Sequence, residues 1–349
     1  MPSFSQTEQD FAELERGEAR MAAMRDAIRE ADRQQDSRWR FQFRYDYLEE
    51  SIFSGDRYSA LIVFPELLKL YDDTPILYED AAYAHNLLVC FRWIVEAAPE
   101  FPQISREQID GYFREFKKRL RQQGKSLSIY YQKRCLFYMH VDRNVAAMCF
   151  YRFLEEELDD ISDGRSFYHE QQVEYYLSIG EEEKALKAAA PVLDGSIRSD
   201  NVPQLMRAEF ARYYTSKSDF DKAMQYAKPI ERIVDGNPYY HDLLGTLLTL
   251  YSVCEPKRAV ELFNRNYTAF AASKNPWLRM LFAIGAAHLF AQVKQHPELQ
   301  AEIHVPYTGS VQELGEQMAH TAADYAAKFD ARNGTDDYMQ RYLHPFEKE

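Results

Sequence analysis

The sequence predicts an all-α protein, an alpha-alpha superhelix (solenoid) of about seven helix hairpins. Three observations lead to this fold class. An alanine returns at steps of 39, 38 and 36 residues, at Ala146, Ala185, Ala223 and Ala259. The 349 residues include only 13 glycines, while alanine, leucine, glutamate, glutamine and arginine are common, which favours helices joined by short turns. No segment shows the alternation of apolar and polar residues that is typical of β-strands.

The first 36 residues predict a helix that caps the array. Apolar residues recur at near-heptad spacing within residues 7–33, which predicts one amphipathic helix that covers the first hairpin; a dimerising coil is the alternative. We therefore expect three parts: a capping helix at residues 1–36, a repeat domain at residues 37–332 and a C-terminal tail at residues 333–349. The polar tail is expected to fray, unless its segment YMQRYLHPF docks back.

Turn residues divide the repeat domain into helix pairs. Prolines cannot continue a helix, so the segment APEFPQIS separates two helices, and Ser105 with Gln108 predicts a capping box for the second. Pro203, Pro238 and Pro276 stand where helices begin, which their fixed φ favours. The predicted pairs are 39–53 with 59–73, 78–98 with 105–123, 126–139 with 143–158, 166–179 with 181–194, 202–217 with 219–234, 238–253 with 256–272, and 276–295 with 310–331.

The context of the recurring alanine resembles the tetratricopeptide repeat, whose usual period is about 34 residues. Ala185 has Tyr176 nine residues before it and Pro191 six residues after it, and the same residue types flank Ala223. The resemblance covers residues 38–275, although the repeats are longer than the usual period. The chain is therefore expected to be tetratricopeptide-like (TPR-like), and a non-repetitive helical bundle is the alternative.

The resemblance implies a right-handed superhelix in which the first helix of each pair lines a concave groove. In the family, groove-facing side chains lie fifteen, eleven and eight residues before the small residue, and Ala60 adds a fifth alanine from which to count. The candidate groove residues are Tyr45, Glu49, Tyr131, Tyr138, Glu170, Glu174, Arg212 and Tyr251. Aromatic faces, paired carboxylates and one arginine suit an extended peptide with basic and apolar side chains. The alternative role for the tyrosines is packing between helices.

The sequence holds no recognisable catalytic or metal-binding signature. It lacks the GxxxxGK[ST], GxGxxG, HExxH and GxSxG patterns, and its nine histidines are scattered. It also lacks the Lys/Asn/Arg series with which some tetratricopeptide domains clamp a peptide carboxylate. We therefore expect no catalytic residue, no metal site and no cofactor, in a protein that is not an enzyme.

Composition bounds the partners and the compartment. The net charge of −13 disfavours a general nucleic-acid binder and binding to an anionic membrane surface. No stretch is long and apolar enough to span a membrane, and the N-terminus lacks a signal pattern. The four cysteines lie in apolar runs without a CxxC pair, as buried residues in a reducing compartment do. We expect a cytoplasmic protein that binds a protein or peptide, and the sequence leaves its oligomeric state open.

Two charge runs stand out. FREFKKRLRQQGK at residues 113–125 predicts a helix whose Phe113, Phe116 and Leu120 face inward, while its basic residues face solvent or an acidic partner. EEELDD at residues 155–160 lacks the ligand spacing and the turn glycine of a calcium loop. We expect a helix end or turn there rather than a metal site.

These observations favour a non-enzymatic scaffold or adaptor that holds a peptide or protein segment in its groove. One alternative is a bacterial signalling regulator similar to the peptide-sensing Rap type, which joins an N-terminal helical bundle to a tetratricopeptide array. Some members act on a response regulator through a bundle glutamine; Gln34, Gln35 and Gln42 stand in that region, but no flanking motif matches. A subunit of a larger assembly, with the outer face as its interface, is the third alternative.

Overall fold

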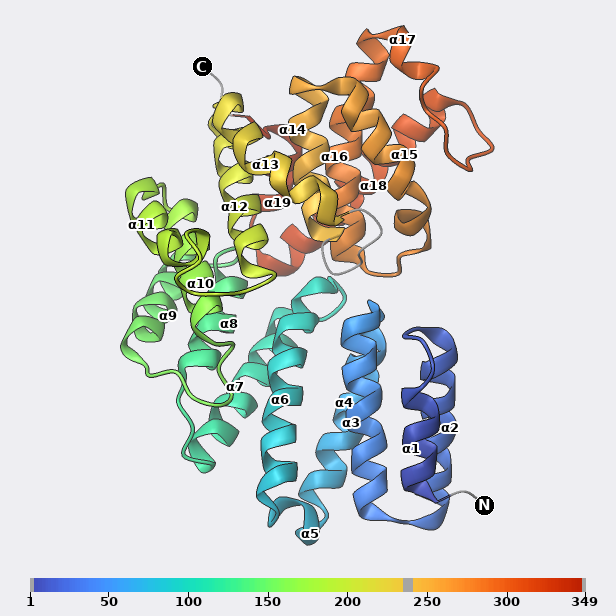
Figure 1. Cartoon of the computed structure of the whole chain (residues 1–349), viewed down its shortest axis with the longest axis vertical. Helices are drawn as coiled ribbons and strands as arrows, with labels where there is room; N and C mark the ends of the chain where they lie inside the picture. The colour runs from blue at the N-terminus through green and yellow to red at the C-terminus, as the bar shows by residue number, and fades with distance from the viewer. Residues whose placement is uncertain (1–2, 235–240, 347–349) are drawn as a thin grey trace. The chain divides into compact units, whose positions relative to one another are not determined.

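The computed structural model describes residues 3–234 and 241–346, and every regular element within these ranges is a helix (Figure 1). The all-α prediction is therefore confirmed. The chain divides into two compact units. Unit 1 comprises residues 1–134 and 155–162, and unit 2 comprises residues 135–154 and 163–349.

Unit 1 is built from the N-terminal helices. These are α1 (Phe4–Ala12), α2 (Glu18–Gln34), α3 (Ser37–Ser54), α4 (Arg57–Asp72), α5 (Pro75–Tyr78), α6 (Ala81–Ala97), α7 (Arg106–Gln122) and the start of α8 (Ser128–Tyr138). The capping box predicted from Ser105 and Gln108 is present at the start of α7. Successive helices α2, α3 and α4 contact one another, and α6 contacts α3, α4 and α7.

The single helix predicted over residues 7–33 is wrong, because the chain turns back between α1 and α2. Gly17 in this turn has a φ of 130°, which residues with a side chain rarely adopt, and its N–H donates to Glu50 Oε1 at 3.0 Å. The turn lets Phe4 and Phe11 pack against Phe43, with ring centroids 5.6 and 5.8 Å apart. The near-heptad stripe therefore belongs to two helices that share one core.

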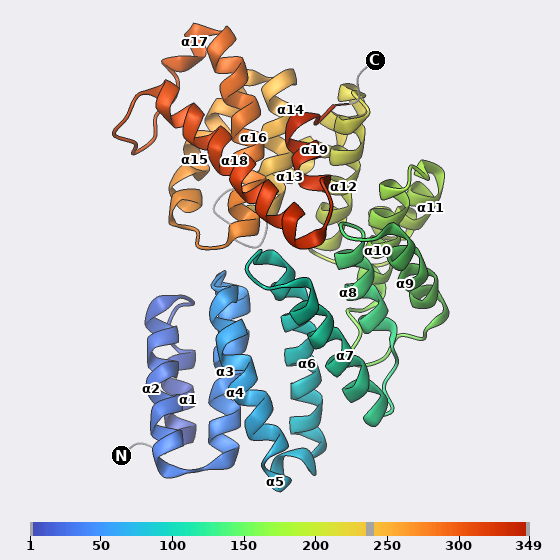
Figure 2. The same cartoon turned by 180° about the vertical axis from the view of Figure 1, so that it is seen from behind.

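Unit 2 contains helix pairs, in which we call the earlier helix the first and the later the second. Its elements are the end of α8, α9 (Arg143–Glu155), α10 (Arg165–Ser178), α11 (Glu182–Leu193), α12 (Val202–Ser216), α13 (Phe220–Val234), α14 (His241–Cys254), α15 (Pro256–Ala272), α16 (Pro276–Gln295), α17 (Pro297–Gln300), α18 (Val311–Asn333) and α19 (Asp337–Leu343). Each first helix contacts the next, from α10 through α12 and α14 to α16, and α18 follows (Figure 2). These pairs match the predicted ones closely; the predicted start at Pro238 lies outside the described residues.

The recurring alanine marks the start of the second helices. It is the fourth residue of α4, α9, α11, α13 and α15, and it is at most 2% exposed in each. The residue four positions earlier is acidic in every case: Asp56, Asp142, Glu181, Asp219 and Glu255. A carboxylate at this place stabilises the positive end of the helix dipole. The recurring alanine thus marks the start of a second helix and a buried position at which that helix packs closely, and both features occur five times.

Helices α14 and α16 cross backbone against backbone. A Cβ on Gly245 would lie 2.2 Å from the carbonyl oxygen of Leu281, and a Cβ on Gly285 would lie 2.5 Å from the carbonyl oxygen of Gly245. Both neighbours are main-chain atoms, which cannot move without shifting a helix. Two glycines, one on each helix, therefore permit this contact.

We predict that Gly245→Ala lowers the free energy of unfolding by about 3 kcal/mol, because the added methyl group forces α14 and α16 apart. Gly111 in α7 is the matched control, since a Cβ there would meet only the Arg114 guanidinium, at 3.7 Å. Gly111→Ala should raise the free energy of unfolding by about 0.5–1 kcal/mol, because alanine loses less entropy in a helix. Chemical denaturation of both variants checks this, and equal effects would contradict the backbone contact.

Candidate functional site

Charged groups predicted for the groove come together on α10 and α12. Arg212 on α12 pairs with Glu209, one turn earlier. Burial alone would lower the pKa of Arg212, but the charges of Glu209, of Glu174 on α10 and of Asp337 on α19 raise it. Glu170, one turn before Glu174, is half-buried. Adjacent first helices thus offer a guanidinium and carboxylates to the same region.

Tyr138 and Tyr251, which were also predicted for the groove, are buried, with 2% and 0% of their surface exposed. The Tyr251 hydroxyl donates to Glu231 Oε2 at 3.2 Å, and the Arg258 guanidinium lies 4.8 Å from the Tyr251 ring centroid. These tyrosines fill the space between helices and present no surface to a ligand. Tyrosine at helical spacing serves packing and binding equally well, so the sequence alone did not separate the two roles.

The predicted groove residues of unit 1 are half-buried. Tyr45 and Glu49 lie on α3, and Tyr131 lies on α8. The ring of Tyr45 packs 5.7 Å from that of Trp93, and burial raises the pKa of Tyr45. The Lys117 ammonium lies 5.4 Å from the centroid of the Tyr131 ring. Both tyrosines therefore already have packing partners within unit 1.

The three N-terminal glutamines bond to groups near them in the chain. Gln34 Nε2 donates to Glu30 Oε1 at 2.6 Å, and Gln35 ends α2 with a φ of 57°. Gln42 Nε2 donates to Asp46 Oδ1 at 2.8 Å. Asp46 Oδ2 is buried without a hydrogen-bond partner in the described residues, and burial raises the pKa of Asp46 to about 7. The response-regulator alternative stays a prediction.

The C-terminal segment, residues 334–346, docks against the helices of unit 2 instead of fraying. Asp337 Oδ2 lies 2.9 Å from His140 Nδ1, just after α8, and 3.1 Å from the Arg341 guanidinium. Although burial opposes it, the bond to His140 and the charges of Arg341 and Arg212 lower the pKa of Asp337. We call His140, Arg212, Asp337 and Arg341 the polar cluster; it joins residues far apart in the sequence.

Three aromatic residues of this segment, spaced four positions apart, also contact other helices of unit 2. Tyr338 is 2% exposed, and its ring centroid lies 5.3 Å from that of Trp277 at the start of α16. The rings of Tyr342 and Phe346 lie 6.2 and 6.3 Å from that of His288, further along α16. In both views of the chain, α19 runs beside α12 and α16 (Figures 1 and 2). The segment therefore packs on α18, the helix before it, and on Phe220 of α13, and its aromatic side chains also contact α16, a first helix of the kind predicted to receive a peptide.

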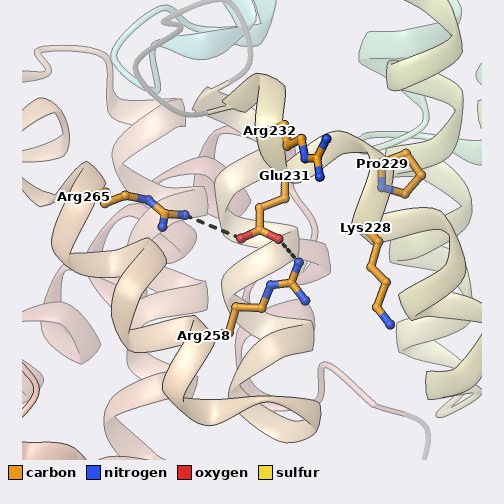
Figure 3. Close-up of a pocket in the computed structure, with 6 residues that line it drawn as sticks. All are labelled: Lys228, Pro229, Glu231, Arg232, Arg258 and Arg265. Atoms are coloured by element: carbon orange, nitrogen blue, oxygen red, sulfur yellow. Dashed lines mark hydrogen bonds and ion pairs between the residues drawn. The ribbon is translucent and has the colours of Figure 1, made fainter.

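A basic depression of about 700 Å³ lies on the second helices α13 and α15 (Figure 3). Its lining residues are Lys228, Pro229, Glu231, Arg232, Arg258 and Arg265. Glu231 bonds to Arg258 and lies 3.5 Å from Arg265, and Arg258 also donates to Glu255 at 2.7 Å. Although burial opposes it, the two arginines and Tyr251 lower the pKa of Glu231. Glu231 thus pairs with two arginines of α15 and joins α13 to it, whereas Glu255 neutralises Arg258 at the start of the same helix.

A similar arrangement joins the preceding pairs. Glu182 Oε1, on α11, accepts the hydroxyl hydrogen of Tyr214 on α12 at 2.7 Å. The same oxygen lies 3.7 Å from Lys222 Nζ on α13, and that ammonium lies 4.7 Å from the Tyr214 ring centroid. A carboxylate, a tyrosine and a cation therefore link one second helix to the next pair, as they do around Glu231.

The two charge runs form internal contacts in unit 1. Phe113, Phe116 and Leu120 are buried on α7, as predicted. Within the acidic run, Asp159 Oδ2 accepts the Ser126 N–H at 2.8 Å, and Asp160 pairs with Lys125 at 2.7 Å. The acidic run therefore holds the chain just before α8.

No protein-family model matches this chain, and a comparison with curated proteins gives no significant match. Within residues 3–234 and 241–346, no three His, Cys, Asp or Glu side chains are grouped as metal ligands. The described helices include none with the length and apolar character needed to cross a membrane. Cys90, Cys135 and Cys149 are buried, as expected, and Cys254 is half-buried.

We predict that Glu231→Gln lowers the free energy of unfolding by about 1–3 kcal/mol, because the amide leaves Arg258 and Arg265 without their shared countercharge. Glu261, exposed on α15, supplies the control. Glu261→Gln removes the same charge and should leave stability nearly unchanged. Thermal denaturation of the two variants measures the difference, and similar losses would show that Glu231 has no special role.

Docking of the C-terminal segment should weaken in mild acid. Burial lowers the pKa of His288 to about 4, against about 6.5 in an unfolded chain. Because the folded pKa is the lower one, the stability that neutral His288 supplies is complete above about pH 6.5 and is lost as the pH falls toward 4. Burial and the charge of Arg341 lower the pKa of His140 as well, so it acts in the same direction.

Hydrogen exchange of residues 337–346, followed by mass spectrometry across this pH window, measures the effect. Exchange, corrected for its intrinsic pH dependence, should rise as the pH falls. His288→Phe should flatten that rise, because phenylalanine keeps the aromatic contact and does not titrate. Identical pH profiles for both proteins would rule out His288 as the source.

Proposed function

We propose that this chain is a non-enzymatic TPR-like adaptor whose helix pairs form a superhelix and whose first helices in unit 2 hold a peptide or protein segment. The observation that carries the proposal is the C-terminal segment itself, which packs on α18 and makes ionic and aromatic contacts with His140, just after α8, and with two residues of the first helix α16. The buried alanines at one fixed place and the contacts between successive first helices support the repeat architecture.

The half-buried side chains that the C-terminal segment now contacts, and Glu174 near them, suit a segment that carries charged and aromatic side chains. Arg212 and His140 can receive a carboxylate, and Glu174 can receive a basic group. Trp277 and His288 provide rings against which aromatic side chains pack. A short helix held by such anchors is a common form of peptide recognition.

Selection from a displayed peptide library against the full chain tests this proposal. Hydrogen exchange should then show protection of α10, α12 and α16 by a selected peptide, with little change in α11, α13 and α15. Glu174→Gln should weaken a peptide that carries a basic group by about tenfold, the effect of one charged hydrogen bond. Glu183→Gln, at an exposed position of α11, is the control and should leave affinity unchanged. Failure to select any peptide, or protection confined to second helices, would overturn the proposal.

A further inference from the structure

The C-terminal segment has the features of a bound ligand more than those of a further repeat. Helix α19 has seven residues, and helices shorter than about 12 residues are marginal without tertiary contacts. It has no following helix with which to pair in the described residues. Gly334 ends α18 in the left-handed conformation, with a φ of 72°, and so redirects the chain. Leu343, on the outward side of α19, is 55% exposed.

The contacts of the segment are concentrated on one face. Asp337 and Arg341 are four residues apart and both reach His140 Nδ1, at 2.9 and 3.1 Å. Tyr338 and Tyr342 are also four residues apart, and their rings lie against Trp277 and His288. Residues four apart on a helix share a face. This face therefore carries a carboxylate beside one aromatic ring and a guanidinium beside the next.

The receiving groups determine what can replace the segment. Tyr338 is 2% exposed, and its ring packs against those of Trp277 and Phe329. Its removal would therefore expose these apolar rings to water. Withdrawal of Asp337 would leave Arg212 and His140 without a carboxylate that both now face. A replacement must supply an aromatic ring and a carboxylate at these places.

We propose that residues 337–346 occupy the site of an external protein segment that carries the same groups in the same order. An acidic residue is followed directly by an aromatic residue, an arginine four positions after the acidic residue is also followed by an aromatic residue, and a further aromatic residue comes last. This inference rests on the proposed function. The resident segment is covalently attached, so its effective concentration is on the order of millimolar. A partner therefore binds more weakly to the intact chain than to a chain whose own segment is undocked.

A release variant, Asp337→Asn/Tyr342→Ala/Phe346→Ala, tests this in the full chain. All three changes lie in the segment, so Arg212, His140, Trp277 and His288 stay unchanged. The control is Gln340→Ala/Leu343→Ala, which alters two exposed positions of the same helix. The probe is a fluorescein-labelled synthetic peptide with the sequence of residues 335–346, and a scrambled peptide tests the order of the groups.

Fluorescence anisotropy should show that the peptide binds the release variant at least about tenfold more tightly than the wild-type chain or the control. In wild type, millimolar peptide should accelerate hydrogen exchange of residues 337–343, because the resident helix is displaced. Equal affinity for all three proteins, or equal binding of the scrambled peptide, would overturn the inference. If the release variant fails to fold, the displacement experiment decides, and unchanged exchange overturns the inference.

Three further outcomes distinguish another occupant, failure of this inference alone, and failure of the proposed function. A concentration-dependent dimer of the release variant, measured by light scattering, would show that a second copy takes the site, which overturns an external partner. If library peptides protect the first helices while the peptide 335–346 binds neither the wild-type chain nor the release variant, the inference is wrong and the proposed function stands. If no peptide of any sequence binds the first helices, both are wrong.

Discussion

Close approach of helices, which only alanine and glycine permit here, is the constraint on which the packing of unit 2 depends. Alanine stands at the fourth position of α9, α11, α13 and α15, and paired glycines allow α14 to touch α16 through the main chain. Larger side chains would separate the helices by the thickness of a methyl group or more, and close-packed interiors do not absorb such changes. The small residues thus fix the spacing at which polar groups on adjacent helices meet.

Charged groups then link the helices that the small residues bring together. Two carboxylates on second helices, Glu182 and Glu231, each bond a tyrosine and a cation of the next pair. The polar cluster differs, because its carboxylate, Asp337, lies in the C-terminal segment. The ion pairs of Glu182 and Glu231 join one helix pair to the next, whereas the polar cluster lies where the C-terminal segment docks. That difference is why we propose recognition on the first helices and a structural role for the basic depression.

The sequence period predicted most of the helix pairs because it records a contact that five of them repeat. The apolar spacing within residues 113–125 predicted that Phe113, Phe116 and Leu120 lie inside, since a strongly amphipathic helix has one way to bury its apolar face. The break between α1 and α2 was missed because an apolar stripe continues across Gly17. The roles of Tyr138 and Tyr251 could not be separated from the pattern, and the polar cluster joins residues nearly 200 positions apart. Such long-range contacts leave no local periodicity, although the segment YMQRYLHPF did indicate an end able to dock.

Asp46 Oδ2, which has no hydrogen-bond partner among the described residues, has a consequence for how unit 1 exchanges protons with solvent. With a folded pKa of about 7 and an unfolded value of about 4, this carboxyl binds a proton as unit 1 folds in mildly acidic solution. Its contribution to the stability of unit 1 therefore increases as the pH falls through that interval. His288 gives up a proton on folding under the same conditions. Folding of Asp46 therefore takes a proton from the buffer, while folding of His288 releases one to it, and the two heats of buffer ionisation have opposite signs. Mild acid would thus stabilise unit 1 through Asp46 and weaken the contact of His288, in unit 2, with the C-terminal helix.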